Sequence, residues 1–274
     1  MSETVSTSAN EGVAVVELNR PEAYNALNPE MARELRQAID GTARDDAVRC
    51  VIIRGAGQNF MAGGDLKAFH SILAKGPGQR KAEIEKLFPD VNATILAVRR
   101  MPKPVIASVR GAAAGFGVSL MAACDLTIAA EDSVFSIAYR HIGLSPDGGL
   151  TWFLPRLVGL RRATEMVLLG EEFDAATAHS IGLVNRVVPP STLETETQDW
   201  ARQFVSGPAL ALGHAKTLLN AASEATLEAQ LTLEKECFVD CFGTADCREG
   251  VTAFIEKRPP RFQSRGALSE GNDA

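Results

Sequence analysis

The chain has 274 residues, of which 46% are hydrophobic and 23% are charged, the balance of an ordinary globular protein. This length fits one large domain or a core with a smaller appendage. The 34 Asp and Glu residues outnumber the 28 Lys and Arg residues, which gives a net charge of −6 at pH 7. A nucleic-acid-binding protein needs a basic face, and the sequence has no cluster of basic residues that could form one. We therefore expect no nucleic-acid partner.

Cysteine use and hydropathy predict a soluble protein of a reducing compartment, which indicates the cytoplasm. The chain has five cysteines, an odd number in a long chain, which disfavours a disulfide framework. Cys237 and Cys241 lie one helical turn apart, but no histidine near them in the sequence completes a zinc set, so no metal site is expected. Residues 1–10 are polar and unlike a signal peptide, and the uncharged run 111–124 is too short to span a membrane.

Strands and helices alternate through the first two thirds of the chain. Apolar runs predict strands at residues 12–18, 50–54, 105–109, 126–129, 135–137 and 184–188. Capping residues and helical spacing predict helices at residues 29–40, from 66, at 80–100, at 116–122, and from the cap Asp174 to Gly182. Gly76-Pro77-Gly78 is predicted to form a loop. This alternation predicts an α/β fold.

The strands are predicted to stop after Pro189-Pro190. The remaining predicted elements are all helices, at residues 195–205, 209–222, 224–242 and 245–257. The change of pattern near Ser206-Gly207-Pro208 predicts a boundary between a core of residues 1–205 and a C-terminal helical region of residues 206–274.

Two segments share one construction, in which an apolar strand leads through glycines to the start of a helix. One segment reaches Gly63-Gly64 and the other reaches Gly115-Phe116-Gly117. Glycine lets the backbone approach a ligand closely, and a helix start presents unpaired N–H groups and the positive end of its dipole. Two such ends could hold one developing oxyanion. The alternative is that these glycines only permit tight packing of helix on strand.

Several blocks, in order along nearly the whole chain, resemble the enoyl-CoA hydratase/isomerase (crotonase) family. The blocks are Asn19-Arg20-Pro21-Glu22, Asn25 to Asn28, Phe60 to Leu66, Lys103 to Ala107, Ile142 to Asp147, Leu154 to Gly159, Ala178 to Val184 and Ala253 to Pro259. The resemblance implies a crotonase-like spiral of strand–strand–helix repeats. It also implies that the C-terminal helices build homotrimers, often paired into hexamers.

The same resemblance assigns a binding site for an acyl-coenzyme A thioester. It implies that the N–H groups of Gly64 and Phe116 are the oxyanion donors and that the carbonyl group of Ala62 receives the adenine amino group. Further coenzyme A contacts are implied at Tyr24, Ala26, Asp65 and Leu66. Lys257 of a neighbouring subunit is a candidate phosphate contact, with a solvated cation as the alternative. Coenzyme A enters as part of the substrate, and no separate cofactor is expected.

The sequence departs from the family's hydratases at both of their catalytic glutamates. Ser119 and Tyr139 stand at those positions, and neither hydroxyl is a base near neutral pH. Asp147 matches the position where family isomerases and aryl-CoA dehalogenases carry a working aspartate; the alternative is a turn residue in Pro146-Asp147-Gly148. Tyr139 could donate a hydrogen bond to substrate or form a pocket wall. His141 is a weaker candidate for proton transfer.

The run from Gly143 to Arg156 looks most like the ring-opening isomerases of phenylacetyl-CoA breakdown, although Gly149-Leu150 replaces their Gly-Gly pair. We therefore expect an enzyme that stabilises an enolate at an acyl-CoA thioester, and most of all an isomerase that shifts a double bond or opens a ring. Two alternatives stay open. One is an enoyl-CoA hydratase with a non-standard base, and the other is a catalytically degraded acyl-CoA-binding or scaffold protein.

Overall fold

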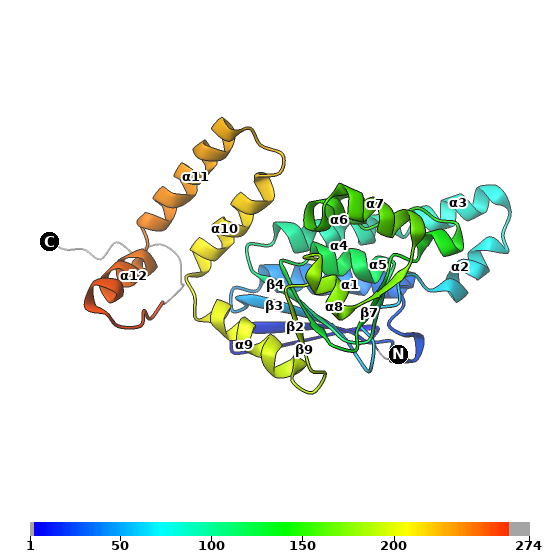
Figure 1. Cartoon of the computed structure of the whole chain (residues 1–274), viewed down its shortest axis with the longest axis horizontal. Helices are drawn as coiled ribbons and strands as arrows, with labels where there is room; N and C mark the ends of the chain where they lie inside the picture. The colour runs from blue at the N-terminus through cyan, green and yellow to red at the C-terminus, as the bar shows by residue number, and fades with distance from the viewer. Residues whose placement is uncertain (1–2, 263–274) are drawn as a thin grey trace.

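A six-stranded sheet forms the centre of the computed structural model, which describes residues 3–262 (Figure 1). The strands lie in the order β1-β2-β3-β4-β6-β9, and each neighbouring pair is parallel except the antiparallel pair β1 and β2. Their bounds are β1 Val5–Asn10, β2 Val13–Leu18, β3 Cys50–Gly55, β4 Val105–Val109, β6 Leu126–Ala130 and β9 Arg186–Val188.

Helices cover both faces of this sheet. The helices of this part are α1 Pro29–Arg44, α2 Leu66–Leu73, α3 Pro77–Glu85, α4 Phe88–Arg100, α5 Phe116–Ala123, α6 Leu150–Val158, α7 Leu160–Leu169, α8 Ala175–Ser180 and α9 Leu193–Val205, with the 3-10 turns η1 Pro21–Ala23 and η2 Tyr139–Ile142. Figure 1 shows α1, α4, α5 and α6 on one side of the sheet and α9 on the other. α2 and α3 project at one end of the molecule.

The continuous apolar runs of the central strands are explained by burial on both faces. Val51 and Ile53 of β3 belong to the large core cluster that includes α1, α4, α5 and α6. Cys50 and Ile52 of the same strand point the other way and pack with Ala201 of α9. Successive side chains of a strand point to opposite faces, so a strand covered on both sides must be apolar throughout.

A second, three-stranded sheet carries the loops of the candidate site. Its order is β5-β7-β8, with bounds β5 Ala112–Ala114, β7 Val134–Ser136 and β8 Glu172–Asp174. The chain passes from β4 of the large sheet to β5 of the small sheet and then into α5, and it repeats this step from β6 through β7 to η2. These are the strand–strand–helix turns of the predicted spiral.

The C-terminal helices extend away from the core as an arm (Figure 1). They are α10 Ala209–Ala221, α11 Leu227–Phe242 and α12 Ala245–Glu256, and no strand follows β9 in the part of the chain that the structure describes. α10 is held to the core by a buried ion pair between Lys216 and Asp125, with 2.7 Å between Nζ and Oδ2. Lys216 also donates to the carbonyl oxygens of Val98 (2.8 Å) and Lys103 (3.0 Å). Residues 263–274 of the predicted C-terminal region lie outside the described residues.

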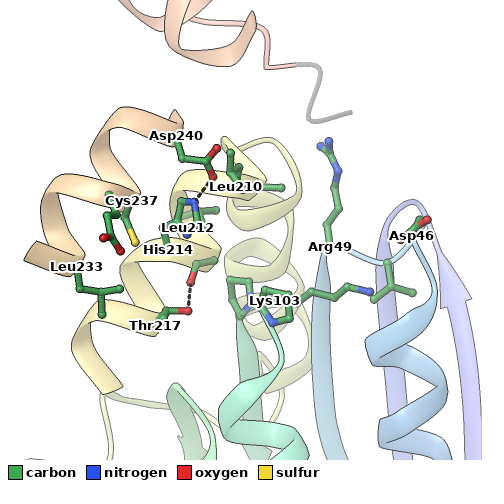
Figure 2. Close-up of a pocket in the computed structure, with 16 residues that line it drawn as sticks. Asp46, Arg49, Lys103, Leu210, Leu212, His214, Thr217, Leu233, Cys237 and Asp240 are labelled. Carbon is green, nitrogen blue, oxygen red and sulfur yellow. Dashed lines mark hydrogen bonds and ion pairs between the residues drawn. The ribbon is translucent and has the colours of Figure 1, made fainter. Parts of the chain in front are cut away.

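A cavity of about 760 Å³ separates α10 and α11 from the loops at one end of the sheet (Figure 2). His214 on α10 faces Asp240 on α11, with 2.7 Å between Nε2 and Oδ2, while Arg49 and Lys103 approach from the core. Among residues 3–262, no helix combines the length and the apolar character needed to cross a bilayer.

Three predicted boundaries were wrong for local reasons. The first helix does not stop at Gly41 but runs to Arg44, because Gly41 is exposed and its carbonyl group still accepts a hydrogen bond from Asp45 N–H (3.2 Å). The predicted loop at residues 76–78 is the start of α3, with Gly76 as N-cap and proline in the first turn, where its missing N–H costs nothing.

The helix predicted over residues 80–100 is two helices. α3 ends at Glu85 and α4 begins at Phe88, with Pro89 in its first turn. A proline in a helix interior removes a hydrogen bond and clashes with the preceding turn, so Pro89 ends one helix and starts the next. The helical spacing of apolar residues continues through both helices, and it therefore did not reveal the interruption. The elements that the sequence analysis did not predict are β1, β5, β8, α6, α7 and the 3-10 turns η1 and η2.

Candidate active site

Close backbone pairing brings the two glycine-bearing turns together. The N–H of Met61 donates to the carbonyl oxygen of Ala112 (3.0 Å), and the N–H of Ala114 donates to that of Met61 (2.8 Å). A Cβ at Gly63 would lie 3.0 Å from the carbonyl oxygen of Ala114, and one at Gly117 would lie 2.3 Å from that of Met61. The glycines therefore permit tight packing, as the alternative in the sequence analysis expected. The same packing places the two turns side by side.

Two unpaired N–H donors border one cavity next to these turns. No acceptor within residues 3–262 contacts the backbone N–H of Gly64 or Phe116. Phe116 is the first residue of α5, where N–H groups lack intrahelical partners and the helix dipole is positive. Both residues line a cavity of about 550 Å³, together with Tyr139 and Asp147. Donors in such a place can stabilise negative charge that develops on a bound carbonyl oxygen.

Ser119, Tyr139 and Asp147 form a hydrogen-bonded cluster at this cavity. The Tyr139 hydroxyl lies 2.6 Å from Oδ1 of Asp147 and 3.2 Å from Oγ of Ser119. Ser119 in turn donates to the backbone carbonyl oxygen of Asp147 (2.9 Å). The three residues come from α5, from η2 and from the turn before α6, so contacts between distant segments fix the position of the carboxyl group.

The surroundings of Asp147 raise its pKa above the ordinary aspartate range. Burial is the main cause, because it penalises the charged form, and the hydrogen bond from Tyr139 opposes it in part. The pKa of Tyr139 is also raised, first by burial and then by the neighbouring charge of Asp147. Tyr139 therefore stays a neutral donor near pH 7, whereas the carboxyl group is the better placed of the two to gain and lose a proton.

A count of protons shows that the cluster fits both charge states of Asp147. When Asp147 is ionised, Tyr139 donates to the carboxylate and Ser119 donates to the backbone carbonyl group. When Asp147 is protonated, it can donate to Tyr139, which can then donate to Ser119, while the bond from Ser119 to the carbonyl oxygen stays. Neither state leaves one of these protons without a partner.

Asp147 is the only carboxylate among the described residues that line the cavity. Much of the remaining lining is apolar and comes from Leu27, Leu66, Phe69, Ile84, Leu87 and Phe88. His141 does not line the cavity, and its Nε2 lies 2.8 Å from the carbonyl oxygen of Gly170, which gives it a structural contact. The described residues contain no group of three or more His, Cys, Asp or Glu side chains placed to hold a metal ion.

Two of the residues predicted to contact coenzyme A lie at this cavity. Ala62 and Leu66 line it, and the N–H of Ala62 donates to the carbonyl oxygen of Tyr24 (3.0 Å). Tyr24 is exposed, and no donor within residues 3–262 contacts the carbonyl oxygen of Ala62. Ala26 is buried and does not line the cavity. The adenine and pantetheine contacts stay predictions.

Asp65 and Lys257, the two charged residues predicted to contact coenzyme A, do not line the cavity. The carboxylate of Asp65 caps α2 by accepting from the N–H groups of Lys67 (3.0 Å) and Ala68 (3.2 Å), and it pairs with Arg20 over 2.8 Å. Lys257 is the C-cap of α12, the last helix of the arm in Figure 1, and it does not line the cavity of its own chain.

Two residues with structural roles at the site were not predicted. Asn25 is fully buried, accepts from the N–H of Arg20 (2.9 Å) and donates to the carbonyl oxygens of Ala56 (3.0 Å) and Asn59 (2.8 Å), which fixes the loop before Ala26. Asn25 has a left-handed φ of 56°, a conformation in which asparagine is enriched. This preference would have pointed to Asn25 only if the turn at this position had been predicted. The second residue is Ser119, and no local sequence signal points to its contact with Asp147.

Comparisons with known proteins agree with this architecture. The Enoyl-CoA hydratase/isomerase family model matches residues 8–265. The chain is 38% identical to 1,2-epoxyphenylacetyl-CoA isomerase of Escherichia coli, with 97% of this chain and 100% of that protein covered. It is 35% identical to crotonyl-CoA hydratase of Syntrophomonas wolfei, with coverages of 96% and 99%.

A solved structure gives the same result. The crystal structure of an enoyl-CoA hydratase from Polaromonas sp. JS666 superimposes with a TM-score of 0.87 at 36% identity and covers 94% of this chain and 99% of that chain. The fold is therefore the predicted crotonase fold, an α/β spiral followed by a helical region. The chain belongs to the enoyl-CoA hydratase/isomerase family.

Proposed function

We propose that this protein is an acyl-CoA isomerase that moves a double bond, or opens a strained ring, through an enolate of the thioester. The proposal is carried by Asp147, the single carboxylate of the described cavity lining, which accepts a 2.6 Å hydrogen bond from Tyr139. The N–H groups of Gly64 and Phe116, which have no acceptor within residues 3–262, border the same cavity. One buried carboxyl group is sufficient for moving a proton between two carbon atoms of one substrate.

The proposed reaction begins with removal of a proton from the carbon next to the thioester carbonyl group, or from its vinylogous position. The Asp147 carboxylate takes this proton, and the negative charge moves to the carbonyl oxygen, where Gly64 N–H and Phe116 N–H donate hydrogen bonds. The protonated Asp147 then returns the proton to another carbon atom. Tyr139 and Ser119 keep the carboxyl group in one orientation through both states.

Hydration is the main rival reaction, because relatives with hydratase names match the chain as fully as the isomerase does. Adding water needs groups that position it and take its proton, and the hydroxyls of Ser119 and Tyr139 are poor bases. The raised pKa of Tyr139 makes it a still poorer one. The composition of the cavity wall thus favours isomerisation.

We also propose that the enzyme works as a cytoplasmic homotrimer or hexamer without a separate cofactor. The arm carries many exposed apolar side chains, among them Leu219, Leu227, Phe238, Phe242, Phe254 and Ile255. A soluble monomer rarely exposes so many apolar groups together, and a second copy of the chain would cover them. In such an assembly Lys257 can reach the coenzyme A phosphates of a neighbour.

The test is to incubate the purified enzyme with 3-enoyl-CoA and with 2-enoyl-CoA in deuterated water and to identify products by mass spectrometry. We expect interconversion of the two enoyl compounds with deuterium incorporation. A 3-hydroxyacyl-CoA product would instead establish a hydratase. Stoichiometric binding of acyl-CoA without turnover of these compounds or of an epoxide of phenylacetyl-CoA would indicate a binding protein.

A further inference from the structure

The ring of Phe69 lies directly against Gly64, one of the two candidate oxyanion donors. A Cβ built on Gly64 would lie 2.6 Å from Cζ and 2.8 Å from Cε2 of Phe69. A Cβ is about 2.5 Å from the backbone nitrogen of its own residue, because both atoms are bonded to the same Cα. The end of the ring is therefore within ~5 Å of the donor nitrogen. The proposed reaction assigns no role to Phe69.

The ring, and not the backbone, explains why residue 64 is a glycine. Gly64 does not have a positive φ, so its backbone conformation would accept alanine. The three atoms nearest to a Cβ there are all ring carbons of Phe69. The backbone is held by Leu27, whose N–H donates to the carbonyl oxygen of Gly63 (2.7 Å) and whose carbonyl oxygen accepts from Asp65 N–H (2.9 Å). Any side chain at position 64 would therefore have to push the ring away.

The position of Phe69 is also fixed by the structure. Its N–H donates to the carbonyl oxygen of Asp65 (3.0 Å), and Asp65 caps α2 and pairs with Arg20 over 2.8 Å. Phe69 is the one residue of α2 that packs against the large core cluster. It also lines the candidate active-site cavity. The ring is thus held between the core and Gly64.

The two oxyanion donors differ in their own burial. Phe116 is 2% exposed, whereas Gly64 is only half-buried. Neither N–H has an acceptor within residues 3–262, so water would solvate whichever donor is left uncovered. A hydrogen bond to a developing oxyanion is stronger where water is excluded, because the local dielectric constant is lower. Gly64 is therefore the donor that needs a cover, and the ring of Phe69 lies against it.

We propose that Phe69 is a positioning residue whose ring excludes water from the N–H of Gly64. The ring offers no strong hydrogen-bond acceptor, so it covers this donor without competing for it. The thioester oxygen then receives a stronger hydrogen bond as its negative charge develops. The glycine at position 64 is what lets the ring come this close. This inference rests on the proposed acyl-CoA function and adds a residue to its oxyanion site.

The carbonyl stretching band of a bound thioester reports the strength of this hydrogen bond without catalysis. Infrared difference spectra would follow butyryl-CoA, a saturated thioester labelled with carbon-13 at the carbonyl group, on the wild type and on Phe69→Ala, Phe69→Leu and Gly64→Ala. Gly64→Ala keeps the N–H, but its methyl group displaces the ring. Leu73→Ala is the matched control, because Leu73 is exposed on the same helix and does not line the cavity.

The wild type should move the band to lower frequency than in free butyryl-CoA, and the control should keep this shift. Phe69→Ala and Gly64→Ala should each lose most of it, and Phe69→Leu should lose an intermediate part. The double alanine variant should lose no more than either single variant, because both changes remove the same contact. In isomerisation, kcat should fall about tenfold in both single alanine variants, less than the ~10²–10³-fold cost of a lost donor.

A full band shift in Phe69→Ala, or additive losses in the double variant, would overturn the proposal. If Phe69→Ala does not fold, a full shift in both Phe69→Leu and Gly64→Ala would overturn it equally. A wild type without any shift would contradict the oxyanion donors themselves, and with them the role of Phe69. If the band shifts follow the expected pattern but no isomerisation is found, the reaction assignment fails and the role of Phe69 stands.

Discussion

The Tyr139 hydroxyl donates to Oδ1 of Asp147 over 2.6 Å, at a cavity bordered by two backbone N–H groups that find no acceptor within residues 3–262. The family resemblance places Tyr139 at a hydratase glutamate position and Asp147 at an isomerase aspartate position, and the structure shows these two side chains in contact. In the function that we propose, a hydroxyl that orients one carboxylate takes the place of a second carboxylate, as proton transfer without water addition would require.

Removal of the Tyr139 hydroxyl should move the pH dependence of the reaction. The hydrogen bond favours ionised Asp147 and so lowers its pKa, which burial has raised. In Tyr139→Phe the pKa should rise further, and because the base form exists only above its pKa, the acidic limb of kcat/KM should shift to higher pH. Ser119→Ala, which leaves the Tyr139–Asp147 bond in place, should shift this limb less. A limb that stays fixed in Tyr139→Phe would argue against Asp147 as the base.

Substitution of Gly63 should disturb the oxyanion donors. Gly63 has φ +89°, and a Cβ there meets the carbonyl oxygen of Ala114 at 3.0 Å, so Gly63→Ala strains the turn that presents Gly64 N–H. We expect kcat to fall about a hundredfold to a thousandfold, the effect of losing one such donor. Steady-state kinetics measures this loss.

Gly41→Ala is the matched control for that variant. Gly41 lies inside α1 with open space around the Cβ position, so alanine there should stabilise the protein by ~0.5–1 kcal/mol and leave kcat unchanged. If urea unfolding and kinetics show similar effects for both alanine variants, the special role of the Gly63 backbone is contradicted.

Lys216→Ala should destabilise the fold by up to ~3–5 kcal/mol, because the largely buried Asp125 loses its nearer cation and keeps only Arg99, at 3.8 Å. Burial raises the pKa of Asp125 and lowers that of Lys216, as expected for a pair removed from water. Arg162→Ala, which breaks the exposed pair with Glu165, should cost at most ~1 kcal/mol. Urea unfolding that gave the two variants equal losses would show that α10 is not held by the buried pair.

Phe254→Asp should break the proposed assembly. Phe254 is 86% exposed on α12, close in sequence to Lys257, and a charge there would prevent an apolar contact with another copy. Sedimentation should show a trimer or hexamer for the wild type and a monomer for the variant, with weaker acyl-CoA binding. A wild type that sediments as a monomer would contradict both the assembly and the role of Lys257.

The parts of the fold with strong local patterns could be predicted from the sequence. β3 and β4 are continuous apolar runs, and Asn28 does cap α1, with its side chain accepting from Met31 N–H (2.8 Å). β1 was missed because its residues are mostly polar and exposed, and it becomes a strand only through antiparallel pairing with β2. α6 was missed because Pro155 lies inside it and glycines precede it.

The sequence predicted which residues form the candidate site but not how these residues are arranged in space. The family resemblance identified Gly64, Phe116 and Asp147, and all three line one cavity. Their relative placement depends on contacts between segments far apart in the sequence, such as Ser119 with Asp147, which local patterns do not encode.

The most direct test of the central claim compares wild type with Asp147→Asn for conversion of 3-enoyl-CoA to 2-enoyl-CoA. The variant keeps the shape of the side chain and loses its ability to take a proton. We predict that isomerisation falls by a factor of about 10² to 10⁴, the usual contribution of a general base, while affinity for butyryl-CoA stays within about twofold. An Asp147→Asn enzyme that isomerises at the wild-type rate would contradict the account.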